Sequence, residues 1–301
     1  MKQTILFLFV FITTIQTTFS QNYKSEFNQL LSKNDTTKQR ILLQKWETEN
    51  NQDPELYVAY FNYFVNRSKQ EIIEIGNNPQ GDDVLKITST DKSKKDPVGY
   101  IYGVQMFNPS LVQKGFFYAD KGLQIAPARL DIRFGKVFVY SKMKDWNNYT
   151  QEIIKAVTYG ATIENKWLWN ENKPLDDPKE FLLSNIQTYQ TQLYDTNDDN
   201  LLIYMRQIAQ AVLKYYPDNV ENLSNLSITY MLNKEYDKAL EPLLTAAKIA
   251  PTDYIVLSNI AYAYKMKGDK KNAIEYYKLV LKHGDVDSSK YAQQQIDELG
   301  R

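Results

Sequence analysis

The chain has 301 residues, with 36 Lys and Arg against 36 Asp and Glu, a single His and no Cys. Zero net charge argues against the basic surface of a nucleic-acid-binding protein, so we expect no nucleic-acid partner. Without Cys the chain can form no disulfide and no Cys-ligated zinc site, and one His cannot build a multi-His site. We therefore expect no cofactor and no bound metal.

Residues 1–20 have the composition of a secretory signal peptide. Lys2 precedes an apolar run at 5–12, and the small residues Thr18 and Ser20 occupy the cleavage positions. The run is too short to span a bilayer, which takes about 20 residues. The alternatives are a retained signal anchor and a buried first helix. Because no Cys lies near the cleavage point, we expect an exported protein that is periplasmic or secreted, soluble, not a lipoprotein, and without a membrane span after cleavage.

The N-terminal segment at 21–75 is predicted to be helical. Apolar residues recur at three- and four-residue spacing over 22–31, 36–49 and 54–64. Asp53, followed by Pro and Glu, is typical of a helix N-cap and first turn. The sequence therefore predicts three helices before the first interruption.

Residues 76–108 are predicted to be an insertion in the helical pattern. Two short apolar stretches, 84–87 and 98–102, are separated by a run of Ser, Thr, Asp and Lys. They fit a small β-hairpin near 84–102, and the same composition also fits a loop.

Residues 109–216 are predicted to form degenerate helical repeats. A helix pair is expected over 130–161, and a second pair is expected from 180–194 and 201–216. Between the pairs, 165–178 is too rich in Pro to form one helix.

Residues 217–285 contain an internal repeat with a period of 34 residues. Aligning 220–230 with 254–264 matches Leu, Ser, Asn, an aliphatic residue and Tyr, and a Pro precedes each copy at the same offset. Each copy shows the spacing of two amphipathic helices joined by a short turn. Residues 286–301 are predicted to form a capping helix that covers the last repeat.

Small and large residues alternate between the two helices of each repeat. Ala239 and Ala273 allow a close approach, and Tyr230 and Tyr264 fill the remaining space. In these features 220–285 resembles the tetratricopeptide repeat (TPR) family. The resemblance implies an all-α solenoid of helical hairpins, and the whole chain looks like an exported TPR protein of the Bacteroidota type.

We find no residue set that favours catalysis. His283 is followed by Gly, which is typical of a helix C-terminus. Residues 195–200 begin like a calcium loop but have Asn200 where the turn needs Gly and Arg206 where the bidentate Glu should stand. The sequence therefore predicts no catalytic residue, no metal site and a non-enzymatic protein.

A second hypothesis rests on the segment from Trp167 to Asp177. Trp167 and Trp169 lie close in sequence to Glu171, Asp176 and Asp177. Glycan hydrolysis uses two carboxylates beside the sugar, and aromatic rings can stack on sugars. The alternative is therefore a carbohydrate-binding protein or a helical glycan hydrolase.

The resemblance to TPR proteins also implies a binding face. In that family the first helix of each repeat lines the concave surface, and a recurring Asn often bonds the backbone of an extended ligand. Carried over to this chain, the candidate residues are Ser224, Asn225, Ile228, Ser258, Asn259 and Tyr262. The leading prediction is a scaffold or adaptor that binds another protein or peptide on this face, with no particular oligomeric state implied.

Overall fold

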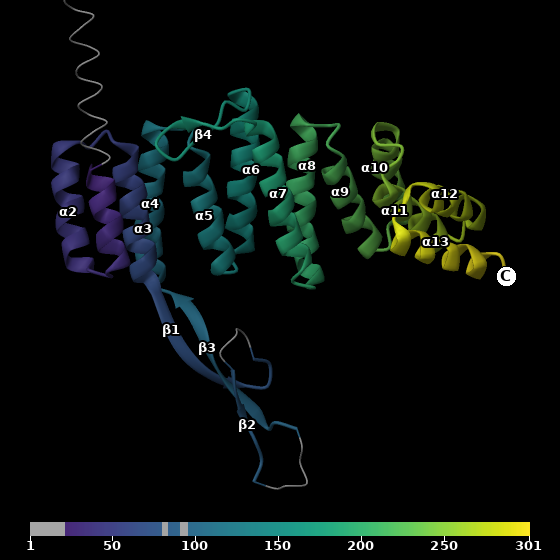
Figure 1. The fold of residues 1–301 in the computed structure, drawn as a ribbon, viewed down its shortest axis with the longest axis horizontal. Helices are drawn as coiled ribbons and strands as arrows, with labels where there is room; N and C mark the ends of the chain where they lie inside the picture. The colour runs from purple at the N-terminus through teal and green to yellow at the C-terminus, as the bar shows by residue number, and fades with distance from the viewer. Residues whose placement is uncertain (1–21, 80–83, 91–95) are drawn as a thin grey trace, which may run out of the picture. The chain divides into compact units, whose positions relative to one another are not determined.

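The computed structural model describes residues 22–79, 84–90 and 96–301, so the predicted leader at 1–20 lies outside the described residues. The described chain is mostly α-helical, with a three-stranded antiparallel sheet inserted between α3 and α4 and a two-stranded sheet between α6 and α7 (Figure 1). The predicted fold class, helical hairpins with a small β insertion, is confirmed.

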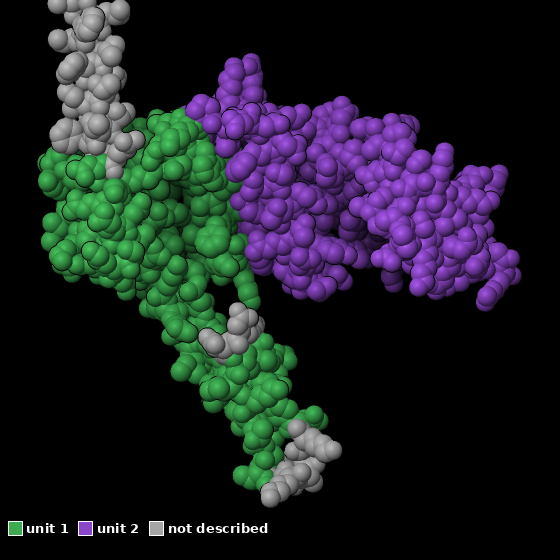
Figure 2. Space-filling model, in the orientation of Figure 1, with its two compact units in different colours: residues 1–144, 169–173 green, residues 145–168, 174–301 purple. Residues whose placement is uncertain are grey.

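The chain divides into two compact units, which Figure 2 colours separately. Unit 1 comprises residues 1–144 and 169–173, and unit 2 comprises residues 145–168 and 174–301. The division falls inside the segment 109–216, which the sequence treats as one stretch of degenerate repeats.

Unit 1 is built from helices that pair in sequence order. The helices are residues 22–32, α2 (Thr36–Glu49), α3 (Pro54–Ser68), α4 (Pro109–Ile125) and α5 (Leu130–Lys142). The side chains of Asp35, Asp53 and Asn108 accept backbone N–H groups at the starts of α2, α3 and α4. Such caps satisfy donors that have no partner within the helix, which explains where these helices begin.

Glycines on α4 allow it to lie close against α3. A Cβ atom at Gly115 would lie 3.2 Å from Val65 Cγ2, and one at Gly122 would lie 3.3 Å from Tyr57 Cβ. These contacts are tighter than ordinary packing, so a larger residue would push the helices apart. The small residues that the sequence places on this helix therefore set its distance from α3.

The inserted sheet belongs to unit 1 and projects from the end of α3 and the start of α4 (Figure 1). Its strands are β1 (Lys69–Gly76), β2 (Val84–Ile87) and β3 (Gly99–Phe107), in the order β1-β3-β2 with antiparallel pairing. Val84 lies opposite Tyr102 and Ile87 opposite Gly99, so the predicted hairpin is confirmed.

Strand β1 corrects the sequence analysis, which assigned residues 69–75 to the N-terminal helical segment. The segment carries three isoleucines, and β-branched side chains favour extended backbone. It pairs with β3 along its whole length, from Lys69 opposite Phe107 to Gly76 opposite Tyr100. The strand depends on this pairing with residues far along the chain, which a local pattern does not reveal.

Unit 2 contains the remaining helices. These are α6 (Trp146–Thr162), α7 (Pro178–Tyr194), the short 3₁₀ helix η1 (Asp199–Leu201), α8 (Leu202–Tyr215), α9 (Val220–Leu232), α10 (Tyr236–Ile249), α11 (Tyr254–Met266), α12 (Lys270–His283) and α13 (Val286–Leu299). Between α6 and α7, the two-residue strands β4 (Leu168–Trp169) and β5 (Lys173–Pro174) pair with each other.

The two copies of the 34-residue repeat fold as the helix pairs α9–α10 and α11–α12. Ala239 and Ala273, the predicted small positions, are fully buried. Ser227 Oγ in α9 donates a hydrogen bond to the backbone oxygen of Ala239 in α10 at 3.0 Å, which joins the first pair. After the second pair, α13 packs Ala292 into the same cluster as Ala273 and Tyr277.

Candidate functional site

The helices α9 and α11 share an outward surface that we call the α9–α11 face. It consists of Ser224, Ile228 and Leu232 on α9, and Ser258, Tyr262 and Met266 on α11. Members on the same helix are four residues apart, so they form a stripe along it, and members on different helices are related by the 34-residue repeat.

The α9–α11 face leaves large apolar side chains in contact with solvent. Leu232, Tyr262 and Met266 are 45%, 39% and 44% exposed, and Ile255 extends the stripe on α11 with 57%. The opposite side of α11 is fully buried, for example at Ile260. The stripe is therefore not used by the core of unit 2. Leu232 and Met266 were missed in the sequence, although continuing the four-residue spacing beyond Ile228 and Tyr262 would have found them.

The two asparagines predicted to bind a ligand backbone have different surroundings. Asn225 is 5% exposed, and its Nδ2 donates to Gln187 Oε1 on α7 at 2.7 Å. Its amide group thus joins α9 to α7. Asn259 is half-buried, and its side chain makes no hydrogen bond to another residue of the described chain. The two equivalent asparagines therefore differ, because the fold holds the amide of Asn225 and leaves Asn259 partly exposed to solvent.

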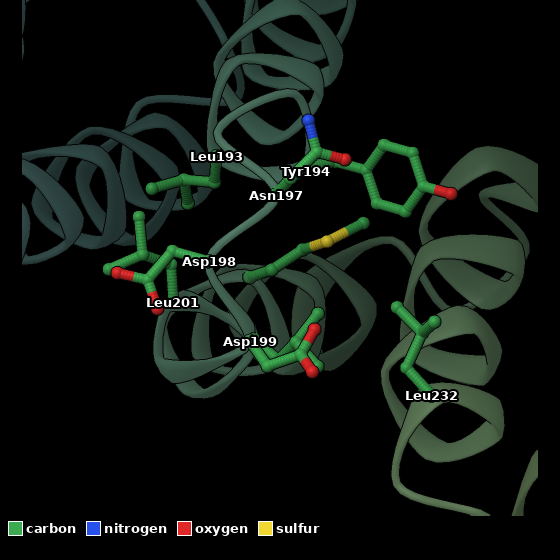
Figure 3. Close-up of a pocket in the computed structure, with 9 residues that line it drawn as sticks. Leu193, Tyr194, Asn197, Asp198, Asp199, Leu201 and Leu232 are labelled. Atoms are coloured by element: carbon green, nitrogen blue, oxygen red, sulfur yellow. The ribbon is translucent and has the colours of Figure 1, made fainter. Parts of the chain in front are cut away.

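A pocket adjoins the α9–α11 face at the end of α9, where Leu232 forms one wall (Figure 3). The other walls come from the end of α7, the turn after it and the start of α8. The remaining lining residues are Leu193, Tyr194, Asn197, Asp198, Asp199, Leu201, Leu202 and Met205. The turn that was compared with a calcium loop therefore forms the acidic part of this pocket.

The pocket is small and mixed in character. Its volume is about 110 Å³, whereas an apolar cavity of about 150 Å³ is known to hold benzene. Leucines and a methionine line its interior, and the carboxylates of Asp198 and Asp199 lie at its edge (Figure 3). It has room for one aliphatic side chain, next to a site that favours a positive charge.

No protein-family model and no curated protein matches the sequence. Among solved structures, YrrB, described as a TPR protein with an unusual peptide-binding site, is 15% identical with a TM-score of 0.41, over 84% of this chain and 97% of that chain. TTC0263, a thermophilic TPR protein of Thermus thermophilus, is 15% identical with a TM-score of 0.36, over 61% and 90%. The yeast Sti1 TPR2AB domain in complex with pHSP90 is 10% identical with a TM-score of 0.35, over 95% and 100%.

The chain's own repeats support the helical-hairpin fold of residues 217–285. The 34-residue period, the helix pair in each copy and the buried alanines between the helices agree with one another. The pairs α9–α10 and α11–α12 therefore have the helical-hairpin fold that the sequence resemblance implies.

Trp167 and Trp169, outside the 34-residue repeats, do not form an exposed platform together. Trp167 is 1% exposed, with its ring centroid 5.7 Å from that of Tyr159, and it touches Gly160 so closely that a Cβ there would lie 3.1 Å from the indole. The expectation that Trp167 presents a face to sugar is therefore wrong, because the ring fills the interior. Trp169 is half-buried and meets Phe134 edge-on.

The carboxylates of the same segment are engaged individually. Hydrogen bonds from Lys173 and Lys24 lower the pKa of Glu171 to about 2, so it stays ionised near neutral pH and is unsuited to be a general acid. Asp177 caps α7 by accepting the backbone N–H of Glu180 at 3.4 Å, and Asp176 is exposed.

The remaining candidates for chemistry lie at helix ends. His283 is the last residue of α12, as predicted from the sequence. Within residues 22–79, 84–90 and 96–301, no group of three or more His, Asp or Glu side chains is arranged to hold a metal ion. Over the same residues, no helix combines the length and the apolar character needed to cross a membrane.

Proposed function

We propose that this chain is a non-enzymatic scaffold or adaptor that binds another protein, or a peptide segment of one, through the α9–α11 face. The observation that carries the proposal is the exposed apolar stripe along α9 and α11. Exposed apolar residues grouped on one surface, with polar groups between them, are typical of protein-binding sites. Ser224, Ser258 and Asn259 supply those polar groups.

The shape of the site favours a particular kind of ligand. The stripe suits one apolar side of a helix or an extended segment. The neighbouring pocket suits an aliphatic side chain as an anchor, and Asp198 and Asp199 favour a Lys or Arg beside it. The preferred ligand is therefore an amphipathic segment with an aliphatic anchor flanked by a basic residue.

We further propose that the protein is exported and acts in the periplasm or outside the cell. The support for this is the leader composition of residues 1–20. Mass spectrometry of the protein from fractionated cells of its source would test it. The expected result is a mature N-terminus at Gln21 in the exported fraction, and an intact N-terminus in the cytoplasm would contradict it.

The binding site is tested with two matched tyrosine variants. Tyr262 on the α9–α11 face is 39% exposed and Tyr291 on α13 is 45% exposed, so both are accessible to a partner, and the melting temperature of each Asp variant checks that the fold is kept. Residues 21–301 of each variant serve as bait for proteins of the envelope fraction, and the Kd of an identified partner is then measured by calorimetry. Tyr262→Asp should weaken binding by at least about tenfold, since central aromatic contacts dominate interface energies.

The control and a second variant make the result decisive. Tyr291→Asp should bind like the wild type, and Asn259→Ala should weaken binding without changing the melting temperature. Asn225→Asp is less informative, because it would break the buried bond to Gln187. Equal Kd values for Tyr262→Asp and wild type would assign the partner to another surface.

The carbohydrate hypothesis has weaker support. Trp167 is buried and Glu171 stays ionised, so Trp169 is the remaining aromatic group of that segment with exposed surface. A panel of soluble glycans, followed by the melting temperature, tests it directly. A shift that Trp169→Ala abolishes would favour glycan binding over the scaffold.

A further inference from the structure

Strand β1 in unit 1 lies at one side of the inserted sheet and is paired along one of its two edges. β3 pairs with it from Lys69 to Gly76, and β3 separates it from β2, so the outer edge of β1 is the one far from β2. Among the described residues, none pairs with that outer edge. The strand has 8 residues, and an unpaired edge of this length is a ready template for another strand.

The peptide groups of Glu71, Ile73 and Ile75 point out of the sheet at this edge. The backbone N–H of Asn108 donates to Ser68 O at 2.7 Å, so Ser68, next before β1, faces β3. Because peptide groups alternate in direction along an antiparallel strand, every second residue after Ser68 faces β3 and the residues between them face away. Three residues therefore offer both N–H and C=O groups to an incoming strand.

Large apolar side chains border the same edge on both faces of the sheet. Ile73 and Ile75 are 77% and 72% exposed on one face, and Ile72 is 40% exposed on the other. Ile75 begins a row across the sheet, in which it lies opposite Ile101, and Ile101 lies opposite Leu85. Exposed apolar side chains that are grouped in this way are typical of a protein-binding surface.

We propose that the chain forms a symmetric dimer in which β1 of one copy pairs antiparallel with β1 of a second copy. The two sheets then join in the order β2-β3-β1-β1-β3-β2. Ile72 of one copy lies opposite Ile72 of the other, on the two-fold axis. Glu71 then lies opposite Ile73 of the second copy. At the ends of the pairing, Lys69 lies opposite Ile75.

The charges of β1 favour this register over its neighbours. Gln70 lies opposite Glu74 of the second copy, so its amide can donate to that carboxylate. Glu71 meets its copy only diagonally, at about 7–8 Å. Sliding the strands by two residues in one direction would bring the two Glu71 directly opposite each other, and in the other direction it would place Glu74 opposite Ile72. Charges on an edge strand commonly prevent pairing, and here they select one register.

A second copy of the chain fits this edge better than other occupants do. An extended segment of another protein would satisfy the peptide groups, but β1 is itself such a segment and is present at the same concentration as the edge it would bind. A helix bonds its backbone groups internally and would leave the outward N–H groups of β1 unpaired. A lipid surface has the same defect, because hydrocarbon offers no hydrogen-bond partner.

Sedimentation of residues 21–301 in the ultracentrifuge measures the dimer directly. We expect the wild type to dimerise reversibly with a Kd below about 100 μM. Ile73→Pro removes an outward N–H of β1 and no bond to β3, so it should raise this Kd at least about tenfold. Ile73→Val keeps the N–H and a β-branched side chain and should dimerise like the wild type. Melting temperatures and circular dichroism of both variants check that the sheet persists.

Cysteine variants test the register, because the natural chain contains no Cys. Opposite residues in a non-hydrogen-bonded antiparallel pair have Cα atoms about 4.5 Å apart, which is within the range of a disulfide. Ile72→Cys should therefore form a covalent dimer when copper phenanthroline and air oxidise the two thiols to one disulfide. Gln70→Cys should form no such dimer alone but should cross-link when mixed with Glu74→Cys. Leu85→Cys, which is exposed on β2, is the control for random collision.

Several results would overturn the proposal. These are a wild type that stays monomeric up to about 1 mM, a dimer that Ile73→Pro leaves intact, or cross-linking of Leu85→Cys as fast as that of Ile72→Cys. In a monomeric wild type, binding of peptides with alternating valine and threonine that Ile73→Pro abolishes would make another protein the occupant. Binding to lipid vesicles that survives Ile73→Pro would make it a membrane.

Discussion

Replacing Arg129 by Met tests how unit 1 is held together. Arg129 is fully buried, and its guanidinium binds Asp131 through two hydrogen bonds of 2.7 Å each. It also pairs with the carboxylate of Glu55, which is 4% exposed. Lys24, in the helix at 22–32, binds the other oxygen of Glu55 at 2.8 Å. Methionine has a similar length, so the variant removes the charge and hydrogen bonds more than the volume.

The expected loss of stability depends on the charged groups that remain buried in the variant. Removing one partner of a buried ion pair typically costs about 3–5 kcal/mol, mostly because the other charge stays buried without compensation. Here Lys24 still faces Glu55, and the side chain of Asp131 is 17% exposed and can be hydrated. We therefore expect the lower end, about 3 kcal/mol of the free energy of unfolding. Urea denaturation at pH 7, followed by circular dichroism, measures it.

The loss should depend on pH in one direction. Burial raises the pKa of Glu55, but the ion pairs with Lys24 and Arg129 outweigh burial, so the pKa lies below its usual value. A carboxyl group with a lowered pKa contributes stability above its unfolded pKa of about 4.3, and this contribution is lost as the pH falls through the folded value. The difference between wild type and Arg129→Met should therefore shrink as the pH is lowered from neutral to well below 4.3.

A surface arginine provides the control for this prediction. Arg40 in α2 is exposed, and Arg40→Met should change the free energy of unfolding by less than about 0.5 kcal/mol. A loss below about 1 kcal/mol for Arg129→Met, or a loss that is the same at both ends of the pH range, would refute the reasoning.

Variants at three further positions test unit 2 by urea denaturation. Ala273→Leu should lower the free energy of unfolding by about 1–3 kcal/mol, because Ala273 on α12 is fully buried against neighbouring helices and the added atoms have no space. An unchanged free energy of unfolding would show a cavity there. Tyr149→Phe should cost about 1 kcal/mol, since the hydroxyl donates to the backbone oxygen of Tyr189 at 2.9 Å; an unchanged stability would mean that water replaces the bond. Asp285→Ala should cost about 1 kcal/mol, because Asp285 caps α13 by accepting the N–H of Ser288 at 2.8 Å, and Asp285→Asn should retain most of the cap.

The features that could be predicted from the sequence are those that depend on nearby residues. The helix pairs α9–α10 and α11–α12 repeat with a fixed offset, and their apolar spacing defines which side is buried. The same offset identified Ile228 and Tyr262 as equivalent positions on one face. The hairpin between β2 and β3 could also be predicted from the sequence, because few residues separate the two strands.

The features that the sequence did not reveal depend on distant partners. Asn225 and Asn259 are equivalent in the repeat, but Gln187, 38 residues before Asn225, takes up the amide of the first. Trp167 became buried because Gly160 leaves space for its ring on α6. Strand β1 formed because residues 100–107 return to pair with it. In each case the local sequence pattern was compatible with two environments, and a contact with a distant residue determined which one formed.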